Sequence, residues 1–132
     1  MKKKNKPIWG TRIKSKTTNT FMKVSSSLGI DRRLFKEDIK ASIAHVEMLN
    51  RQKIINFKTK NKIIWGLKRI NNQIVKKKYL FDYKDEDIHM SIEKSLFELI
   101  GDDAGFIHTA RSRNDQVLVD FKLWMINSNK KL

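Results

Sequence analysis

Residues 31–52 read DRRLFKEDIKASIAHVEMLNRQ. The apolar residues in this stretch recur at spacings of mostly three and four: Leu34, Phe35, Ile39, Ile43, Val46 and Leu49. One face of an α-helix repeats every 3.6 residues, so this spacing places them on a single apolar stripe. We therefore predict one amphipathic helix that begins at Asp31 and runs to about Gln52.

The same periodicity returns further along the chain. A second helix is predicted after Thr59, which is a plausible N-cap, and its outward face is almost wholly basic. A third helix is predicted to start near Phe81, with acidic residues in its first turn and Gly101 as its C-terminal stop. The stripes of these two helices are Ile63, Leu67, Ile70 and Ile74, and then Ile88, Ile92, Leu96 and Leu99.

The two ends of the chain differ from this middle part. Residues 1–20 are basic, contain no acidic residue and hold the only proline, so we predict a mobile arm. Residues 101–110 are predicted to be a short polar loop. A fourth helix is expected to begin between Ser112 and Asp115 and to bury Val117, Phe121 and Trp124. No strand is predicted, so the fold class is all-α.

Composition limits the kinds of function. The 132 residues suffice for one hydrophobic core, and the absence of cysteine excludes disulfides, thiolate metal sites and a cysteine nucleophile. No apolar run is long enough to span a bilayer, and no apolar run follows the basic start as in a signal peptide, so we expect a cytoplasmic protein. The net charge of +15 is carried mostly by lysine, which favours compositional drift over a specific nucleic-acid or membrane partner.

Residues 108–116, HTARSRNDQ, form the most unusual polar stretch. The amides at a helix N-terminus attract anions, Arg113 can fork onto a carboxylate, and Ser112 and Asn114 can add hydrogen-bond donors. One interpretation is therefore a carboxylate or phosphate pocket. The other is that Ser112 only caps the helix, with Asp115 completing an imperfect capping box and the arginines solvated.

Four blocks of sequence resemble the argininosuccinate lyase and delta-crystallin family, in the order and spacing of that family. They are Trp9-Gly10 with Arg12, the segment from Asp31 to Ser42, the segment from Asp85 to Gly101 that includes Asp85-Glu86-Asp87-Ile88-His89, and the stretch from His108 to Gln116. The resemblance implies the N-terminal helical domain of a fumarase/aspartase-type lyase over residues 21–111. It further implies that residues 112–132 begin the central helical bundle, with the chain ending inside its first helix.

The resemblance also implies roles for individual residues. Ser27 and Asp31 would bind substrate, with Asp31 holding the guanidinium group, although Asp31 could also be a helix N-cap. Ser112, Arg113 and Asn114 would hold the carboxylates of the succinyl half. The sequence departs from the family at 24–26 and in its very basic second helix.

The histidines are weaker candidates. His89 matches a family histidine near the active site and could position a group, although a lone histidine early in a helix is more often structural. His108 could orient the binding loop, and His45 has no suggested partner. No two histidines have the short helical spacing of a zinc site, so we expect no metal, and no cofactor is implied.

Family members cleave argininosuccinate to arginine and fumarate by β-elimination, in arginine biosynthesis, and act as homotetramers whose active sites combine residues of several subunits. The groups linked to proton abstraction, a Thr-His motif and a serine loop, lie beyond residue 132 in the family. The resemblance therefore implies that this fragment alone is inactive. Two other functions stay open: a basic helical nucleic-acid-binding protein using residues 1–19 and 58–78, and a non-catalytic partner that docks on a full-length lyase.

Overall fold

The computed structural model describes residues 19–82 and 84–130, and within these ranges it contains helices and no strand. The all-α prediction is thus confirmed for the described part. Most of the predicted arm, residues 1–18, lies outside the described residues, while Asn19 and Thr20 already belong to the first helix. The helices are α1 (Asn19–Ser25), α2 (Leu28–Asp31), η1 (Arg32–Leu34), α3 (Phe35–Arg51), α4 (Phe57–Val75), α5 (Ile88–Ile100), η2 (Gly101–His108) and α6 (Arg113–Asn129).

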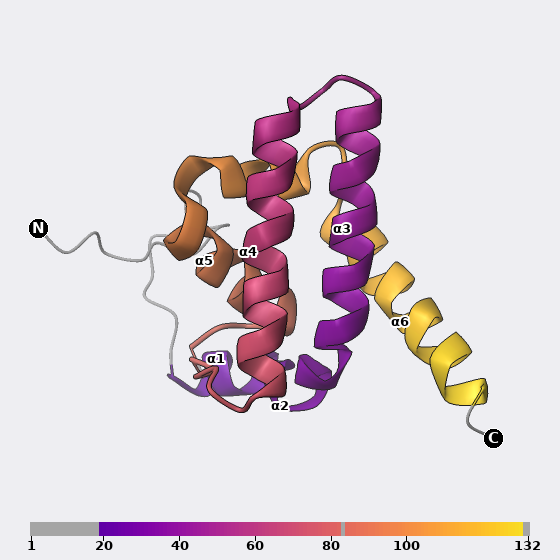
Figure 1. Ribbon diagram of the computed structural model, residues 1–132. Coiled ribbons are helices and arrows are strands. Elements are labelled where there is room, and N and C mark those ends of the chain that lie inside the picture. The colour runs from indigo at the N-terminus through magenta and orange to yellow at the C-terminus, as the bar shows by residue number, and fades with distance from the viewer. Residues whose placement is uncertain (1–18, 83, 131–132) are drawn as a thin grey trace, which may run out of the picture.

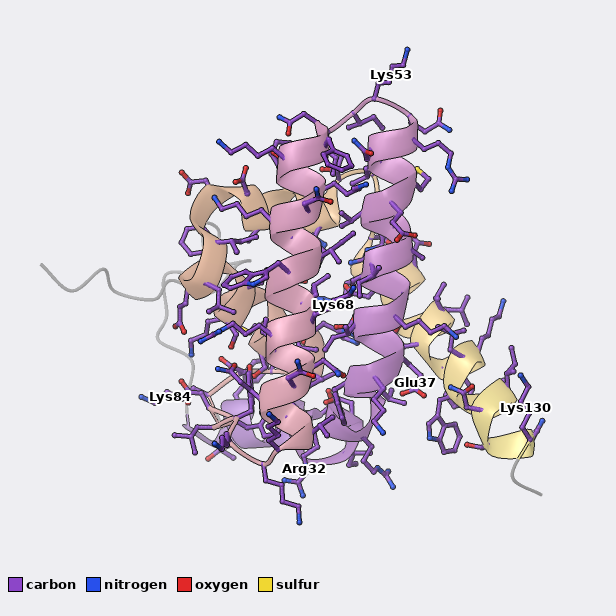
Figure 2. The ribbon with its side chains drawn as sticks, viewed as in Figure 1. Arg32, Glu37, Lys53, Lys68, Lys84 and Lys130 are labelled. Atoms are coloured by element: carbon purple, nitrogen blue, oxygen red, sulfur yellow. The ribbon has the colours of Figure 1, made fainter. Side chains whose placement is uncertain are left out.

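The centre of the fold is an antiparallel pair formed by α3 and α4, which run side by side (Figure 1). Their connection turns at Lys53, which has a left-handed backbone with φ of 60° and lies at the tip of the pair (Figure 2). Helix α5 packs against α4, and η2 packs against α5. Helix α6 packs against α3 and then extends away from the other helices (Figure 1).

The hydrophobic core lies between these helices and contains most residues of the predicted stripes, while Phe35, Ile43, Ile74 and Leu99 are partly buried and pack against it. Ile63, Leu67 and Ile70 of α4 have no exposed surface, and neither do Ile88 and Leu96 of α5. The remaining core residues are Leu28, Ile39, Val46, Leu49, Ile55, Ile92, Ile100, Ala104 and Ile107. Helical spacing of apolar residues therefore identified the buried faces of α3, α4 and α5 correctly.

Several predicted helix boundaries were wrong, two of them because another nearby residue caps the helix. The second helix begins at Phe57, where the Asn56 side chain accepts a hydrogen bond from the backbone N–H of Thr59, so Asn56 and not Thr59 is the N-cap. The third begins at Ile88 with Asp87 as its cap, and its first turn has no acidic residue. The single helix predicted from Asp31 is divided into α2, η1 and α3.

The predicted polar loop at 101–110 is also wrong. Residues 101–108 form the 3₁₀ helix η2, which buries Ala104 and Ile107 in the core. Gly101 has φ of 70°, a conformation that favours glycine, and it ends α5 as expected.

The fourth helix begins as predicted, after Ser112, but it buries other residues. Val117, Phe121 and Trp124 are each more than 40% exposed, whereas the residues buried in α6 are Gln116 and Asp120. The expectation that the apolar residues would be buried was wrong because α6 meets α3 and α5 through polar side chains. The apolar residues face away from the other helices.

The outward face of α4 exposes Lys58, Lys62, Lys68 and Arg69. It also exposes Phe57, Trp65 and Val75, so the prediction of an almost wholly basic face is correct only in part. Lys68 lies midway along this face (Figure 2). Within the described residues, no helix combines the length and the apolar character required to cross a membrane.

Gly66 marks the close approach of α4 to α5. A Cβ at this position would lie 2.5 Å from Leu96 Cδ1 and 3.3 Å from Ile100 Cγ2. Overpacking a core costs about 1–3 kcal/mol, and the better helix propensity of alanine offsets at most about 1 kcal/mol of this. We expect Gly66→Ala to lower the free energy of unfolding in urea by about 1 kcal/mol. Gly105→Ala, where a Cβ meets no atom within 4 Å, is the control and should change it by less than about 0.5 kcal/mol. An equal effect of both substitutions would contradict this packing argument.

Candidate functional site

The N-terminus of α6 carries three of the predicted binding residues, Ser112, Arg113 and Asn114. The Ser112 hydroxyl accepts a hydrogen bond from the backbone N–H of Asp115 at 3.2 Å, and the Asp115 carboxylate accepts one from the backbone N–H of Ser112 at 3.0 Å. This is a complete capping box, so Ser112 does cap α6, and the box is not the imperfect one that was expected. Asn114 is exposed on the same turn.

Arg113 is held by several partners, so the expectation of a solvated arginine was wrong. Its Nη1 and Nη2 atoms donate to the two carboxylate oxygens of Glu93 at 2.9 and 3.2 Å. Nη1 also donates to Oε1 of Gln116 at 2.9 Å, and Nε lies 3.9 Å from the carboxylate of Asp87. These contacts fix the plane of the guanidinium, while 30% of the side chain stays exposed.

Ser27 and Asp31 form a second small cluster. The Ser27 hydroxyl donates to one oxygen of Asp31 at 2.5 Å, and the other oxygen of Asp31 accepts from the backbone N–H of Ile88 at 3.1 Å. The Asp31 side chain makes no capping hydrogen bond to η1, which follows it. Asp31 is therefore not the side-chain cap of the helix that follows it, as the alternative had proposed. Its carboxylate instead accepts a hydrogen bond from the first backbone N–H of α5.

The two clusters meet at the start of α5. The backbone N–H of Ser27 donates to the Glu86 carbonyl at 2.8 Å, and Asp31 contacts Ile88. Asp87, which lies between them, is the residue that faces Arg113. The structure thus brings an anionic group from residue 31 and a cationic group from residue 113 to neighbouring residues of α5. Ser112 and Asn114 lie next to Arg113 on α6.

His89 does not belong to this surface but to a buried polar cluster below it. Its Nδ1 lies 3.2 Å from Asp38 of α3 and 3.4 Å from Asp120 of α6. All three side chains are at most 3% exposed. Arg111 lies close enough to act electrostatically on both carboxylates, and its guanidinium donates to the Ser42 hydroxyl at 3.3 and 3.4 Å.

The cluster changes the protonation of its members. Burial, together with the charge of Asp38, raises the pKa of Asp120 to about 7. Burial alone disfavours a charged imidazole, but the neighbouring carboxylates outweigh it and raise the pKa of His89. Burial would raise the pKa of Asp38 too, yet the His89 contact dominates and lowers it.

We expect this cluster to make stability depend on pH. A carboxyl with a raised folded pKa stabilises the fold when protonated, and this contribution is lost as pH rises through about 7 for Asp120. The raised pKa of His89 acts in the same direction. The free energy of unfolding in urea should therefore fall by more than about 1 kcal/mol between about pH 5 and about pH 8.

Asp120→Asn tests the cause, because a neutral amide removes the titrating carboxyl and should flatten this slope. Asp82→Asn is the control, since Asp82 is exposed and its pKa is lowered by Lys94. If the Asp120→Asn variant kept the full slope, the cluster would not be the source of the pH dependence.

The same three side chains are the only His, Asp or Glu group in the described ranges whose donor atoms could share a cation. Their donor atoms lie within 4.8 Å of one another. Two carboxylates and one imidazole are acceptable ligands for a divalent ion. The charge of Arg111 nevertheless already faces both carboxylates, and Asp38 also accepts from Gln116. The imidazole of His89 lies within ion-pair distance of both carboxylates, while Oδ2 of Asp38, Nδ1 of His89 and both carboxylate oxygens of Asp120 have no hydrogen-bond partner among the described residues.

The other two histidines have partners that the sequence did not suggest. His108 pairs with Glu93, the residue that also holds Arg113, and His45 Nε2 lies 2.9 Å from the Thr109 carbonyl. Both therefore help to fix the segment that precedes α6. Sequence reasoning missed Glu93, Gln116, Asp38 and Asp120. These residues could have been found as polar side chains at helix positions that the 3.6-residue periodicity places on the side facing the core.

Comparison with known proteins places this chain in a family. A sequence model of the family described as Lyase matches residues 11–132. The chain belongs to this lyase family. The curated relatives that it matches include argininosuccinate lyases, so the resemblance seen in the sequence is confirmed.

Three of these relatives show the extent of the similarity. The argininosuccinate lyase of Pelagibacter ubique is 58% identical over 130 residues, which is 98% of this chain and 28% of that protein. The one of Ehrlichia ruminantium is 47% identical over 96% of this chain and 27% of its own length. The one of Leuconostoc mesenteroides is 48% identical over 89% of this chain and 26% of its own length. The chain spans about a quarter of the length of these relatives.

Proposed function

We propose that this chain is the N-terminal portion of an argininosuccinate lyase and that it supplies one wall of the substrate pocket. The reaction is the cleavage of argininosuccinate to arginine and fumarate by β-elimination, in the biosynthesis of arginine in the cytoplasm. One observation carries the proposal beyond the family: Asp31 and Arg113 reach adjacent residues at the start of α5. Groups suited to the two ends of one substrate therefore contact neighbouring residues, which supports a shared binding surface.

The charges of this surface fit the substrate. Argininosuccinate has a guanidinium-derived group at one end and carboxylates at the other. An ionised Asp31 is a suitable acceptor for the first, and Arg113 with Asn114 can donate to the second. The positive end of the α6 dipole lies at the same turn and favours the same anionic groups.

This arrangement suits the difficult part of a β-elimination. Removal of a proton next to a carboxylate places negative charge on that carboxylate in the transition state. Donors that are already oriented lower the barrier because they need no reorganisation as the charge develops. Arg113 is oriented in this way by Glu93 and Gln116. The proton itself must go to a base, which we assign to a part of the enzyme outside this chain.

Association with further helices completes the proposal. The exposed apolar residues of α6 give it a face that a helical bundle could cover: Val117, Leu118, Phe121, Trp124, Met125 and Ile126. We propose that the bundle of the intact enzyme, a homotetramer, covers this face and brings the other walls of the pocket. The proposal needs no cofactor.

The isolated 132-residue chain should release no fumarate from argininosuccinate, because the base and the opposite walls of the pocket are missing. Fumarate is measured by its ultraviolet absorbance. Turnover that scales with the purified chain and survives removal of contaminating lyase would contradict this expectation.

The proposal itself is tested with a chimera in which residues 1–132 replace the matched segment of the Pelagibacter ubique relative. At 58% identity the replaced surfaces should be compatible, and the chimera should cleave argininosuccinate. The unmodified relative is the positive control. Circular dichroism and oligomer size establish that the chimera has folded before its rate is compared.

A further inference from the structure

The first half of α6 is held against the rest of the fold by polar side chains. Gln116 is 1% exposed and Asp120 has no exposed surface, while the apolar residues of the same helix point outward. Apolar contacts allow a helix to slide or rotate by small amounts, whereas hydrogen bonds fix both distance and direction. Gln116 donates such a hydrogen bond to Asp38 of α3, whereas neither carboxylate oxygen of Asp120 has a hydrogen-bond partner in the described part of the chain. The rotation of α6 about its axis is therefore set by the Gln116 contact.

A continuous chain of contacts runs from Arg113 into the buried cluster. Nη1 of Arg113 donates to Oε1 of Gln116 at 2.9 Å, and Nε2 of Gln116 donates to Oδ1 of Asp38 at 2.5 Å. The same Asp38 oxygen lies 3.2 Å from Nδ1 of His89, which also faces Asp120. Each end of the Gln116 amide thus has one partner, and the amide cannot turn over without losing both.

Glu93 alone does not fix Arg113 in three dimensions. Its two oxygens hold one edge of the guanidinium through Nη1 and Nη2, but a side chain held by a single carboxylate can still pivot about it. Gln116 provides the second, independent contact, and it comes from a residue whose own position is fixed by burial. Two contacts from different helices define where the exposed part of Arg113 points.

We propose that Gln116 is a positioning residue that holds Arg113 in place through its own hydrogen bond to Asp38 in the buried Asp38–His89–Asp120 cluster. This inference rests on the proposed function of Arg113 in holding substrate carboxylate. Gln116 is hydrogen-bonded to Arg113 and is only 1% exposed, so we expect it to act through Arg113. Loss of such a supporting contact typically reduces activity by about tenfold to a hundredfold.

The test is a double-mutant cycle in the folded chimera. Gln116→Met keeps the length of the side chain and removes both hydrogen bonds, and it should lower turnover by about tenfold to a hundredfold. In the Arg113→Lys background the same substitution should cost less than about threefold, because the group it positions is already gone. Gln116→Leu also removes both hydrogen bonds and should lower turnover in the same way, which gives a second reading if the methionine variant folds poorly.

Asn127→Ala provides the matched control. Asn127 also anchors α6 to α3, by donating to Oε1 of Glu37 at 3.0 Å, but it lies near the opposite end of the helix from Arg113. Glu37 itself is labelled in Figure 2. The substitution should lower the melting temperature without changing turnover by more than about twofold.

Each outcome has a distinct meaning. If Gln116→Met lowered turnover by the same factor with and without Arg113→Lys, its role would be structural only and the inference would be overturned. The same conclusion would follow if Gln116→Met and Asn127→Ala lowered turnover equally. If Arg113→Lys itself left turnover unchanged, the proposed function of Arg113 would fail first. A large loss of turnover from Gln116→Met that disappears in the Arg113→Lys background would support both the function of Arg113 and the positioning role of Gln116.

Discussion

Arg113→Lys and Asn114→Ala, each introduced into the chimera, should lower the turnover of argininosuccinate by roughly a hundredfold to a thousandfold, because each removes an oriented donor from a charge-stabilising pocket. Lysine keeps the charge of Arg113 but cannot make the paired contact with Glu93 and the contact with Gln116 at the same time. Asn114 is exposed and its loss leaves no buried group without a partner. Its effect should therefore be on the reaction rather than on the fold.

Turnover and melting temperature must be measured together. A helix cap or an exposed arginine is worth on the order of 1 kcal/mol of stability and nothing in catalysis. Near-normal turnover in both variants, or loss of activity only through unfolding, would mean that this turn is a capped helix start and nothing more. Asp115→Ala is a useful comparison, because it breaks the capping box and should mainly affect stability.

Asp31→Asn should act on binding rather than on turnover. The substrate guanidinium loses a charged acceptor, and hydrogen bonds to charged groups are worth about 1.5–3 kcal/mol, so KM should rise by about tenfold to a hundredfold. The fold should tolerate the change, because the remaining Oδ1 of asparagine can still accept from the N–H of Ile88. The expected result is a large change in KM with a melting temperature close to that of the parent.

Asp102→Asn serves as the control for Asp31→Asn, since Asp102 is exposed on η2 and has no assigned role. It removes the same charge and should leave KM unchanged within about twofold. If both variants behaved alike, the effect would come from net charge. If neither changed KM, Asp31 would serve only to hold the start of α5.

The sequence predicted the fold well where apolar periodicity controls it. The stripe Ile63, Leu67 and Ile70 is buried as expected, because nothing but packing decides those positions. The starts of the helices were less predictable. Asn56 and Thr59 are both acceptable caps by residue type, and only the hydrogen bond from the Thr59 N–H to Asn56 selects between them.

Helix α6 shows the limit of periodicity. Its apolar residues suggested a buried face, yet its contact with α3 uses Gln116 and Asp120. A polar residue can be buried when it has a partner, and the partners Asp38 and His89 lie far away in the chain. No local pattern records such a pairing.

The sequence predicted which residues belong to the candidate site, but not how they contact one another. Ser27, Asp31 and Arg113 were named from the sequence, and the structure brings them to the start of α5. Glu93 was not foreseen, because a carboxylate on a predicted helix is usually solvated. Only the fold shows that it holds both Arg113 and His108.

The rate of fumarate release by the folded chimera tests the central claim most directly. If residues 1–132 form one wall of an argininosuccinate lyase pocket, the chimera should turn over argininosuccinate within about tenfold of the unmodified Pelagibacter ubique relative, since the transplanted wall would carry the same groups. A chimera that folds and assembles like the relative, yet releases no fumarate, would contradict the claim.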